Sequence, residues 1–159
     1  MARRSRNGPL TRREEAAWRA MVRAFVVLPR VIEADLLASS GLNLADYTVI
    51  ANLSEQPTQS MRMSELAAQA ALSASGLTRV VERLARQGIV ERTRSEDDGR
   101  GQVARLTDLG RQRLTQAYPP HVESVRRRVL DHFDPGDLAA LTAALNAVGA
   151  PDQPDAAAR

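Results

Sequence analysis

Hydroxyl, small and arginine side chains recur at helical spacing between residues 73 and 86, a pattern that can read DNA. On a wheel of about 100° per residue, one sector holds the apolar side chains of Leu77, Val80, Val81 and Leu84. The opposite sector holds Ser75, Gly76, Arg79, Glu82, Arg83 and Arg86, with Thr78 at its edge. Small N-terminal side chains let a helix approach the major groove, and an arginine one turn later reaches base edges.

Different contacts are predicted for the two ends of this face. Ser75, Gly76 and Arg79 have the size and spacing for base edges, whereas Arg83 and Arg86, further along, are placed to reach phosphates. Glu82 lies one turn from Arg79 and from Arg86 and can orient either guanidinium. The competing interpretation of the isolated segment is the solvated polar face of an ordinary amphipathic helix.

A polar turn with several arginines follows this segment directly. Strand-forming residues at 89–94 and 102–106 flank the turn 95–101, which predicts a β-hairpin. The hairpin concentrates cations, from Arg92, Arg94, Arg100 and Arg105. Asp98 stands two residues before Arg100 and can brace its guanidinium for insertion into a narrow minor groove. A simple charged turn is the alternative.

Residues suited to catalysis are scarce. The chain has no cysteine, which excludes thiol nucleophiles, disulfides and thiolate zinc sites. The two histidines, His121 and His132, are expected on one helix three turns apart, about 16 Å, too far to share a metal. No nucleophile motif or phosphate loop accompanies them. We therefore expect no enzyme, no cofactor and no metal.

Composition fits one globular domain. The chain has 159 residues, a net charge of +3 and 22 basic residues, every one an arginine. Its length suffices for a hydrophobic core without disulfides or metal. No apolar run approaches the length of about 20 residues that a bilayer crossing needs, so a cytoplasmic protein without membrane contact is expected.

Capping signals divide the chain into helices. Thr11 with Glu14 predicts the start of a long helix ending at Gly41, and Asn43 begins a second helix through about residue 55. Residues 56–62 are expected as a loop, 63–70 as a short helix, and 73–87 as a helix with Ser73 as its N-cap. Thr107 begins a helix to about His132, interrupted at Pro119 and Pro120, and a last helix spans about 134–148.

These motifs together resemble the MarR family of bacterial transcription regulators. The resemblance rests on segments 63–67, 72–92, 98–101 and 106–110, and it extends to residues 41–47 and the last helix start. It implies a mainly α fold with a small β-hairpin wing: a winged helix-turn-helix lobe on a helical dimerisation base. The lobe would comprise 43–107 and the base 11–40 and 108–149, while 1–9 and 151–159 are expected to be disordered.

The resemblance also implies partners and site residues. A homodimer would bind a pseudo-palindromic double-stranded DNA operator, as a repressor, with two recognition helices about 34–36 Å apart. Ser75, Gly76, Thr78 and Arg79 would read bases, and Arg100 braced by Asp98 would enter the minor groove. A small aromatic or phenolic ligand would bind in a cleft, which Trp18, Met21 and Tyr47 could line, and its binding would cause the protein to release DNA.

Alternatives remain for both the site and the function. Trp18 can instead anchor a dimer interface, and Tyr47 can instead belong to the core. The competing functions are a sequence-tolerant DNA-coating protein and a protein-interaction module without ligand response. A coating protein would bind all sequences similarly with a steep salt dependence, whereas a regulator prefers its operator by about three orders of magnitude or more.

Overall fold

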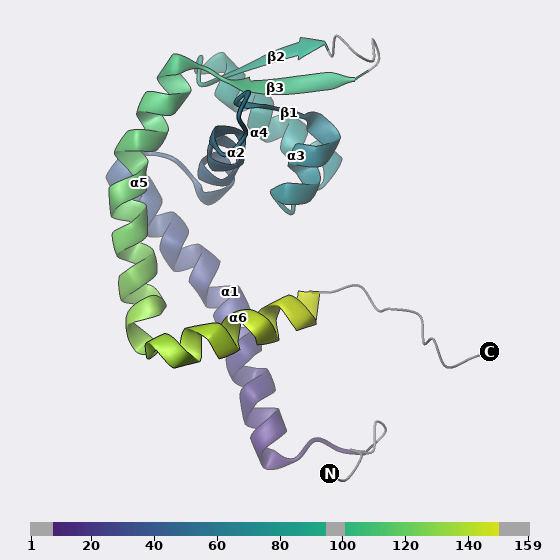
Figure 1. Cartoon of the computed structure of the whole chain (residues 1–159), viewed down its shortest axis with the longest axis vertical. Coiled ribbons are helices and arrows are strands. Elements are labelled where there is room, and N and C mark those ends of the chain that lie inside the picture. Colours follow the sequence, from purple (N-terminus) through teal and green to yellow (C-terminus); the bar gives the residue numbers. More distant parts are fainter. Residues whose placement is uncertain (1–7, 95–100, 150–159) are drawn as a thin grey trace, which may run out of the picture.

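A mainly helical chain carries a small antiparallel sheet, as the sequence predicted (Figure 1). The computed structural model describes residues 8–94 and 101–149. The helices are α1 (Arg12–Ser40), α2 (Leu44–Ser54), α3 (Met63–Gln69), α4 (Ala74–Arg86), α5 (Asp108–Arg128), the 3-10 helix η1 (Leu130–His132) and α6 (Pro135–Gly149). The strands are β1 (Ser60–Arg62), β2 (Val90–Arg94) and β3 (Gln102–Leu106).

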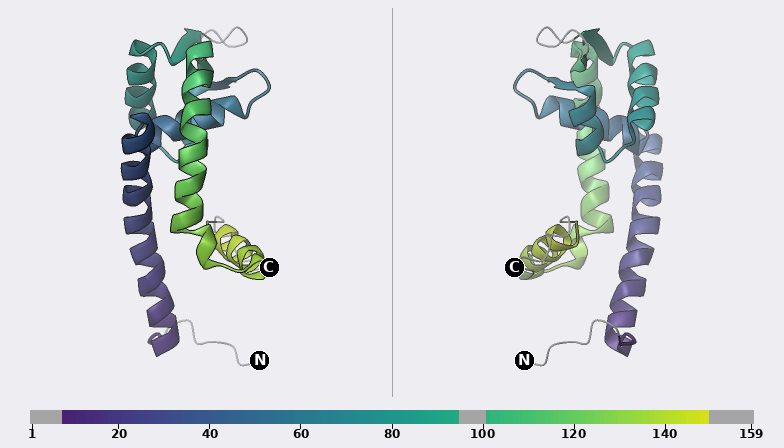
Figure 2. Two further views of the ribbon diagram at one scale, coloured as in Figure 1. Left: turned by 90° about the vertical axis from the view of Figure 1, so that its left-hand side faces the viewer. Right: turned by 90° about the vertical axis from the view of Figure 1, so that its right-hand side faces the viewer.

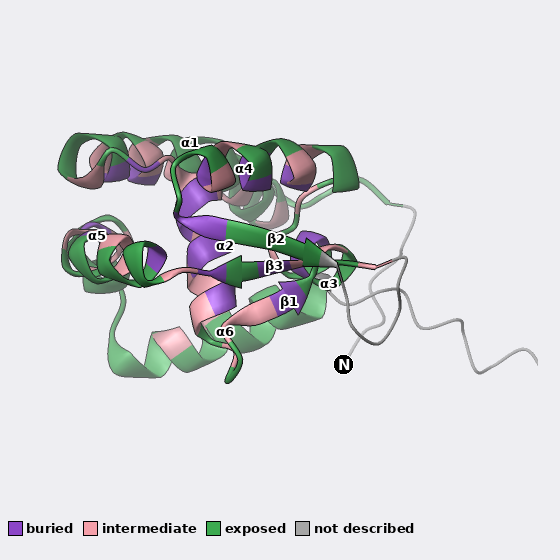
Figure 3. Ribbon diagram, turned by 90° about the horizontal axis from the view of Figure 1, so that it is seen from above, coloured by how far each residue is buried: buried purple, intermediate pink, exposed green. Residues whose placement is uncertain are grey.

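The hydrophobic core lies in a lobe formed by α2, α3, α4 and the sheet. The strands are antiparallel in the order β1-β3-β2, and both Met61 and Arg92 are opposite Ala104. Seen from above, buried residues gather on α2 and on the strand faces that cover it (Figure 3). The side chains of largest volume there include Ile50, Leu53, Leu66, Leu77, Leu84 and Leu106. In this packing the apolar sector of α4 faces inward.

Helices α1 and α5 extend side by side from the lobe, and α6 projects away from the end of α5 (Figure 2). Asp35 of α1 accepts hydrogen bonds from Ser124, Arg127 and Arg128 of α5, at 2.6, 3.0 and 3.2 Å. Of the apolar residues of α1, only Ile32 and Leu36 are buried. Trp18, Val22 and Phe25 of α1 and most of α6 are exposed within a single chain, whereas Met21 and Leu28 are half-buried.

The helix starts follow the predicted caps. Thr11 and Glu14 form a reciprocal capping box, and Gly41 ends α1 at φ 71°. Asn43, Ser73 and Thr107 each accept a hydrogen bond from the backbone N–H three residues later. Each cap satisfies an amide that has no partner inside its helix.

The segment 56–62 is not wholly a loop, because Ser60–Arg62 forms strand β1. The segment is too short and too polar to show strand alternation. Met61 becomes buried against Ala104 only when β3 supplies the hydrogen-bonding edge. The prediction of a loop there was wrong for these three residues.

Helix α5 continues through Pro119 and Pro120, so the predicted interruption was wrong. A proline inside a helix costs about 3 kcal/mol, but Ala117 and Ser124 on either side are buried and hold the helix in place. The helix ends at Arg128, and His132 lies in η1. His121 and His132 therefore do not share one helix as expected.

Among the described residues, no helix is both long and apolar enough to span a bilayer. The tails 1–9 and 151–159, expected to be disordered, fall outside the described residues except for Gly8 and Pro9.

Candidate nucleic-acid interface

Helix α4 presents the predicted polar face at the surface of the lobe. Ser73, Ser75, Arg79 and Arg86 are exposed, whereas Gly76, Thr78 and Arg83 are half-buried. Leu77, Val81 and Leu84 are fully buried on the opposite side. The first turn of α4 contains no acidic residue, so its free amides and the helix dipole favour an approaching anion.

The N-terminus of α4 is held by Ser73. Its Oγ accepts from the Gly76 amide at 3.1 Å and lies 3.4 Å from the Ser75 Oγ. A Cβ added at Gly76 would lie 3.0 Å from the Ser73 Oγ, so any larger residue there would crowd the cap. Thr78 donates its hydroxyl to the Ala74 carbonyl at 2.9 Å. The side chains that precede Arg79 are thus short and locally ordered.

Arg83, which was predicted to reach phosphates, forms an ion pair within the lobe in this structure. Its Nε and Nη2 both donate to Oδ1 of Asp46 on α2, at 3.2 and 2.5 Å. Asp46 is 5% exposed, so this carboxylate is buried beside the core. The guanidinium of Arg83 is therefore already engaged inside the lobe. Exposed Arg79 and Arg86 make no ion pair with another described residue in this structure.

Glu82 pairs across the lobe rather than along its own helix. Its carboxylate is 3.3 Å from Nη1 of Arg92 on β2 and orients neither Arg79 nor Arg86. Arg92 also donates to the side chain of Gln102 on β3. The expected i,i+3 or i,i+4 role of Glu82 was wrong, because the strand places a competing arginine next to it.

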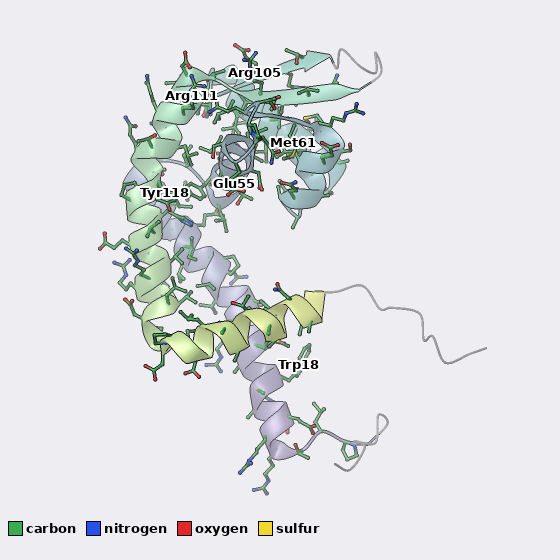
Figure 4. The ribbon with its side chains drawn as sticks, in the orientation of Figure 1. Trp18, Glu55, Met61, Arg105, Arg111 and Tyr118 are labelled. Atoms are coloured by element: carbon green, nitrogen blue, oxygen red, sulfur yellow. The ribbon has the colours of Figure 1, made fainter. Side chains whose placement is uncertain are left out.

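The tip of the hairpin lies outside the described residues. Asp98 and Arg100 fall in that part, so the proposed brace between them stays a prediction. The backbone of Arg94 is opposite Gln102 at the last pair of the β2–β3 ladder. Arg105 is exposed on β3, at the top of the lobe (Figure 4).

The three residues proposed for a ligand cleft are not brought together. Trp18 is 54% exposed on the part of α1 remote from the lobe (Figure 4), where a shallow groove of about 340 Å³ runs past it. Tyr47 is buried in the lobe against His121, and Met21 is half-buried on α1. Of three grooves on the described part of the chain, only one is lined by any of these residues, and that residue is Trp18. Within one chain, they do not form the expected cleft.

A larger groove lies between α1 and the end of α5. Its volume is about 850 Å³, and its floor along α1 runs from Ala16 to Val31. Arginines from both helices line it together with Phe133: Arg19, Arg23, Arg127 and Arg128. The sequence did not predict this groove, because the groove depends on where α5 ends.

Sequence reasoning also missed Asp46 and the role of Arg92. Asp46 was not predicted as a site residue, and its pairing with Arg83 spans 37 residues. Local patterns carry no signal for a partner at that separation. A charged residue on an otherwise uncharged helix was the one available hint, since a buried carboxylate needs a partner.

Known proteins resemble this chain in both sequence and fold. A family model described as the MarR family matches residues 40–101. The crystal structure of Sco3205 from Streptomyces coelicolor, a MarR family transcriptional regulator, superposes with a TM-score of 0.87 and 33% identity, covering 96% of each chain. The chain belongs to the MarR family.

Two further proteins are similar to this chain, one in fold and one in sequence. AbsC from Streptomyces coelicolor superposes with a TM-score of 0.83 and 37% identity, over 89% of this chain and 95% of that one. The transcriptional repressor MprA of Escherichia coli strain K12 is 29% identical over 85 residues. That match covers 54% of this chain and 48% of MprA, so the chain spans about half the length of the curated relative it matches.

Proposed function

We propose that this chain is a sequence-specific double-stranded DNA-binding transcription regulator, with α4 as its recognition helix. The observation that carries the proposal is the exposed face of α4, where Ser75 and Arg79 follow a helix N-terminus free of carboxylates and Arg86 lies at the other end of the helix. The similar protein Sco3205 was solved in complex with DNA. Arg79 would donate two hydrogen bonds to a guanine edge, and Arg86 would bind phosphate.

The wing would add a second contact beside the first. Strand β2 packs against α4 and pairs with β3, so the hairpin that these strands form would approach the groove that neighbours the one α4 enters. Arg100, braced by Asp98, is proposed for the minor groove, with Arg94 nearby. The narrow minor groove of A·T-rich DNA has an enhanced negative potential that attracts an arginine.

A homodimer would place two such lobes on one operator. Apolar side chains of α1 and α6 are exposed in the single chain, including Phe25 at 56% and Val148 at 62%. The groove floor from Ala16 to Val31 is about 24 Å long, and α6 with 15 residues is about 22 Å long. Helix α6 of a second copy fits that groove in length and polarity, and burying both faces would favour association.

This assigns different tasks to the parts of the chain. Residues 43–107 would form the DNA-binding lobe, while 11–40 and 108–149 would form the dimerisation base. A two-fold axis through the base gives a pseudo-palindromic operator with half-sites one helical turn apart. Repression is the proposed outcome, since a dimer bound across a promoter excludes other proteins from it; the partial match to the repressor MprA supports this choice.

Direct binding measurements test the proposal. The full chain is titrated with the duplex upstream of its own coding region and with scrambled duplex of equal length, at 50 and 200 mM salt. A regulator of its own promoter prefers the upstream duplex by about 10³-fold or more. Equal affinity for both duplexes with a steep salt slope supports the DNA-coating alternative, and binding to neither supports a protein-interaction module.

A further inference from the structure

Two neighbouring residues of α4 form ion pairs on opposite flanks of its exposed face. Arg83 pairs with Asp46 of α2, and Glu82 pairs with Arg92 of β2. On the helical wheel, Arg83 lies about 40° to one side of Arg79 and Glu82 about 60° to the other. Arg79 therefore projects between two points at which α4 is tied to the rest of the lobe.

The Asp46–Arg83 pair is the more buried of the two. The Asp46 side chain is 6% exposed and that of Arg83 36%. Asp46 stands in the first turn of α2, where the helix dipole favours a carboxylate, and Asn43 caps its amide at 2.8 Å. Burying a carboxylate costs free energy unless a hydrogen-bond donor pairs with it. The conformation in which Arg83 donates to Asp46 is therefore strongly preferred.

The Glu82–Arg92 pair connects α4 to the hairpin. The distance is 3.3 Å, and the side chains are 54% and 29% exposed. Arg92 also donates to Gln102, so the contact reaches both strands that carry the wing. An exposed pair of this kind contributes little to stability, but it restricts how α4 turns relative to the sheet.

We propose that Asp46 and Arg83, with Glu82 and Arg92, are positioning residues that fix the rotation of α4 about its axis. This inference rests on the proposed function. Arg83 then acts through Asp46 and does not contact phosphate. At about 6 Å from the helix axis, a rotation of about 20° moves a side-chain atom by about 2 Å. Such a displacement takes Arg79 out of hydrogen-bond range of a base edge while leaving α4 near the backbone.

The test compares two DNA affinities for each variant of the full chain. The wild-type chain first selects its preferred duplex from a random-sequence library. Dissociation constants are then measured on that duplex and on its scrambled form, across a salt series. The variants are Asp46→Asn, Arg83→Gln, the double variant and Glu82→Gln. Glu123→Gln, an exposed change on α5 outside the lobe, controls for the loss of one negative charge.

Loss of preference, rather than loss of binding, is expected. Asp46→Asn and Arg83→Gln should each reduce the preference for the selected duplex about tenfold, and the double variant should lose no more. Glu82→Gln should reduce the preference about threefold. Affinity for scrambled DNA should match that of Glu123→Gln within about threefold, and the salt slope should not change. A merely structural role would lower the unfolding temperature without altering the preference of the folded fraction.

Opposite results overturn the inference in distinguishable ways. If Arg83→Gln weakens binding to both duplexes equally and lowers the salt slope by about one while Asp46→Asn has no effect, Arg83 contacts phosphate. If all variants keep the wild-type preference, α4 needs no such positioning. If circular dichroism shows that Asp46→Asn does not fold, the exposed change Glu82→Gln decides. A wild-type chain that selects no sequence overturns the proposed function itself.

Discussion

The imidazole of His121 on α5 lies against the phenol ring of Tyr47 on α2, with ring centroids 4.2 Å apart and planes inclined by 39°. The His121 Nδ1 is buried without a hydrogen-bond partner among the described residues. Tyr47 directly follows Asp46, which pairs with α4. Consecutive residues of α2 thus contact α5 on one side and α4 on the other.

Stability should decrease in mildly acidic solution because of His121. Burial lowers the pKa of this imidazole from its usual value of 6.5, so the folded chain favours the neutral form. Its contribution to the free energy of unfolding is present above about pH 6.5 and is lost as the pH falls toward the lower folded-state pKa. Urea unfolding between pH 5.5 and 7.5 measures this loss.

His121→Phe should unfold with a flatter pH dependence over that range, because phenylalanine keeps the ring contact without a titrating group. His132→Gln is the matched control, since His132 is exposed and should leave the wild-type dependence intact. An unchanged pH profile in His121→Phe would assign the acid sensitivity to other groups.

The pKa of Asp35 should lie well below that of an ordinary aspartate. Hydrogen bonds from Arg128 and then Ser124 lower the pKa of Asp35 to about 2. Its contribution to stability is complete above the unfolded value of about 3.9 and is lost as the pH falls through about 2. NMR titration of the carboxyl carbon measures the pKa directly.

The two arginines at Asp35 offer a matched comparison. Arg128 donates from Nε and Nη2 to the two carboxylate oxygens, whereas Arg127 donates one hydrogen bond. Arg128→Ala should therefore raise the pKa of Asp35 more than Arg127→Ala does. The reverse order would mean that the α1–α5 contact is organised differently in solution.

Gly110 should not tolerate a side chain. A Cβ there would lie 2.3 Å from the Ile89 carbonyl oxygen and 2.5 Å from Leu106 Cδ1. Gly110→Ala must separate the start of α5 from the hairpin and should cost about 1–3 kcal/mol of stability. Gly136→Ala, which meets nothing within 4 Å, should instead gain about 0.5–1 kcal/mol. Equal thermal unfolding midpoints for the two variants would contradict the close contact.

Arg79 and Arg86 should differ in how they affect DNA binding. Arg79→Ala should cost about 1–3 kcal/mol on the preferred duplex and relax specificity at one base pair. Arg86→Ala should weaken binding similarly on all sequences and reduce the salt slope by about one. Titrations on single-base variants of the duplex separate these outcomes, and uniform weakening by Arg79→Ala would remove its base-reading role.

Charge on α6 should dissociate the proposed dimer. Leu145 is 42% exposed in the single chain. Leu145→Glu would place a carboxylate in the apolar contact and should raise the dimer dissociation constant at least tenfold. Sedimentation equilibrium measures it, with Thr115→Glu in the lobe-facing half of α5 as control. A dimer that is indifferent to Leu145→Glu would exclude α6 from the interface.

The sequence by itself determined where four helices start and which face of α4 is buried. Thr11, Asn43, Ser73 and Thr107 could be recognised as caps because each bonds an amide only three residues away. The apolar sector of α4 is likewise a local, periodic property, and Leu77, Val81 and Leu84 are fully buried as expected. Interactions of such short range leave their signal within one segment.

Only the tertiary structure decided which charged groups meet. Arg83 has the same type and nearly the same wheel position as Arg79, yet Arg83 turns to Asp46 because folding buries that carboxylate beside it. Strand β1 and the continuous course of α5 through Pro119 also depend on distant neighbours, namely Ala104 and the packing of α5. Desolvation and packing act between segments remote in sequence, so their outcome is set when those segments come together.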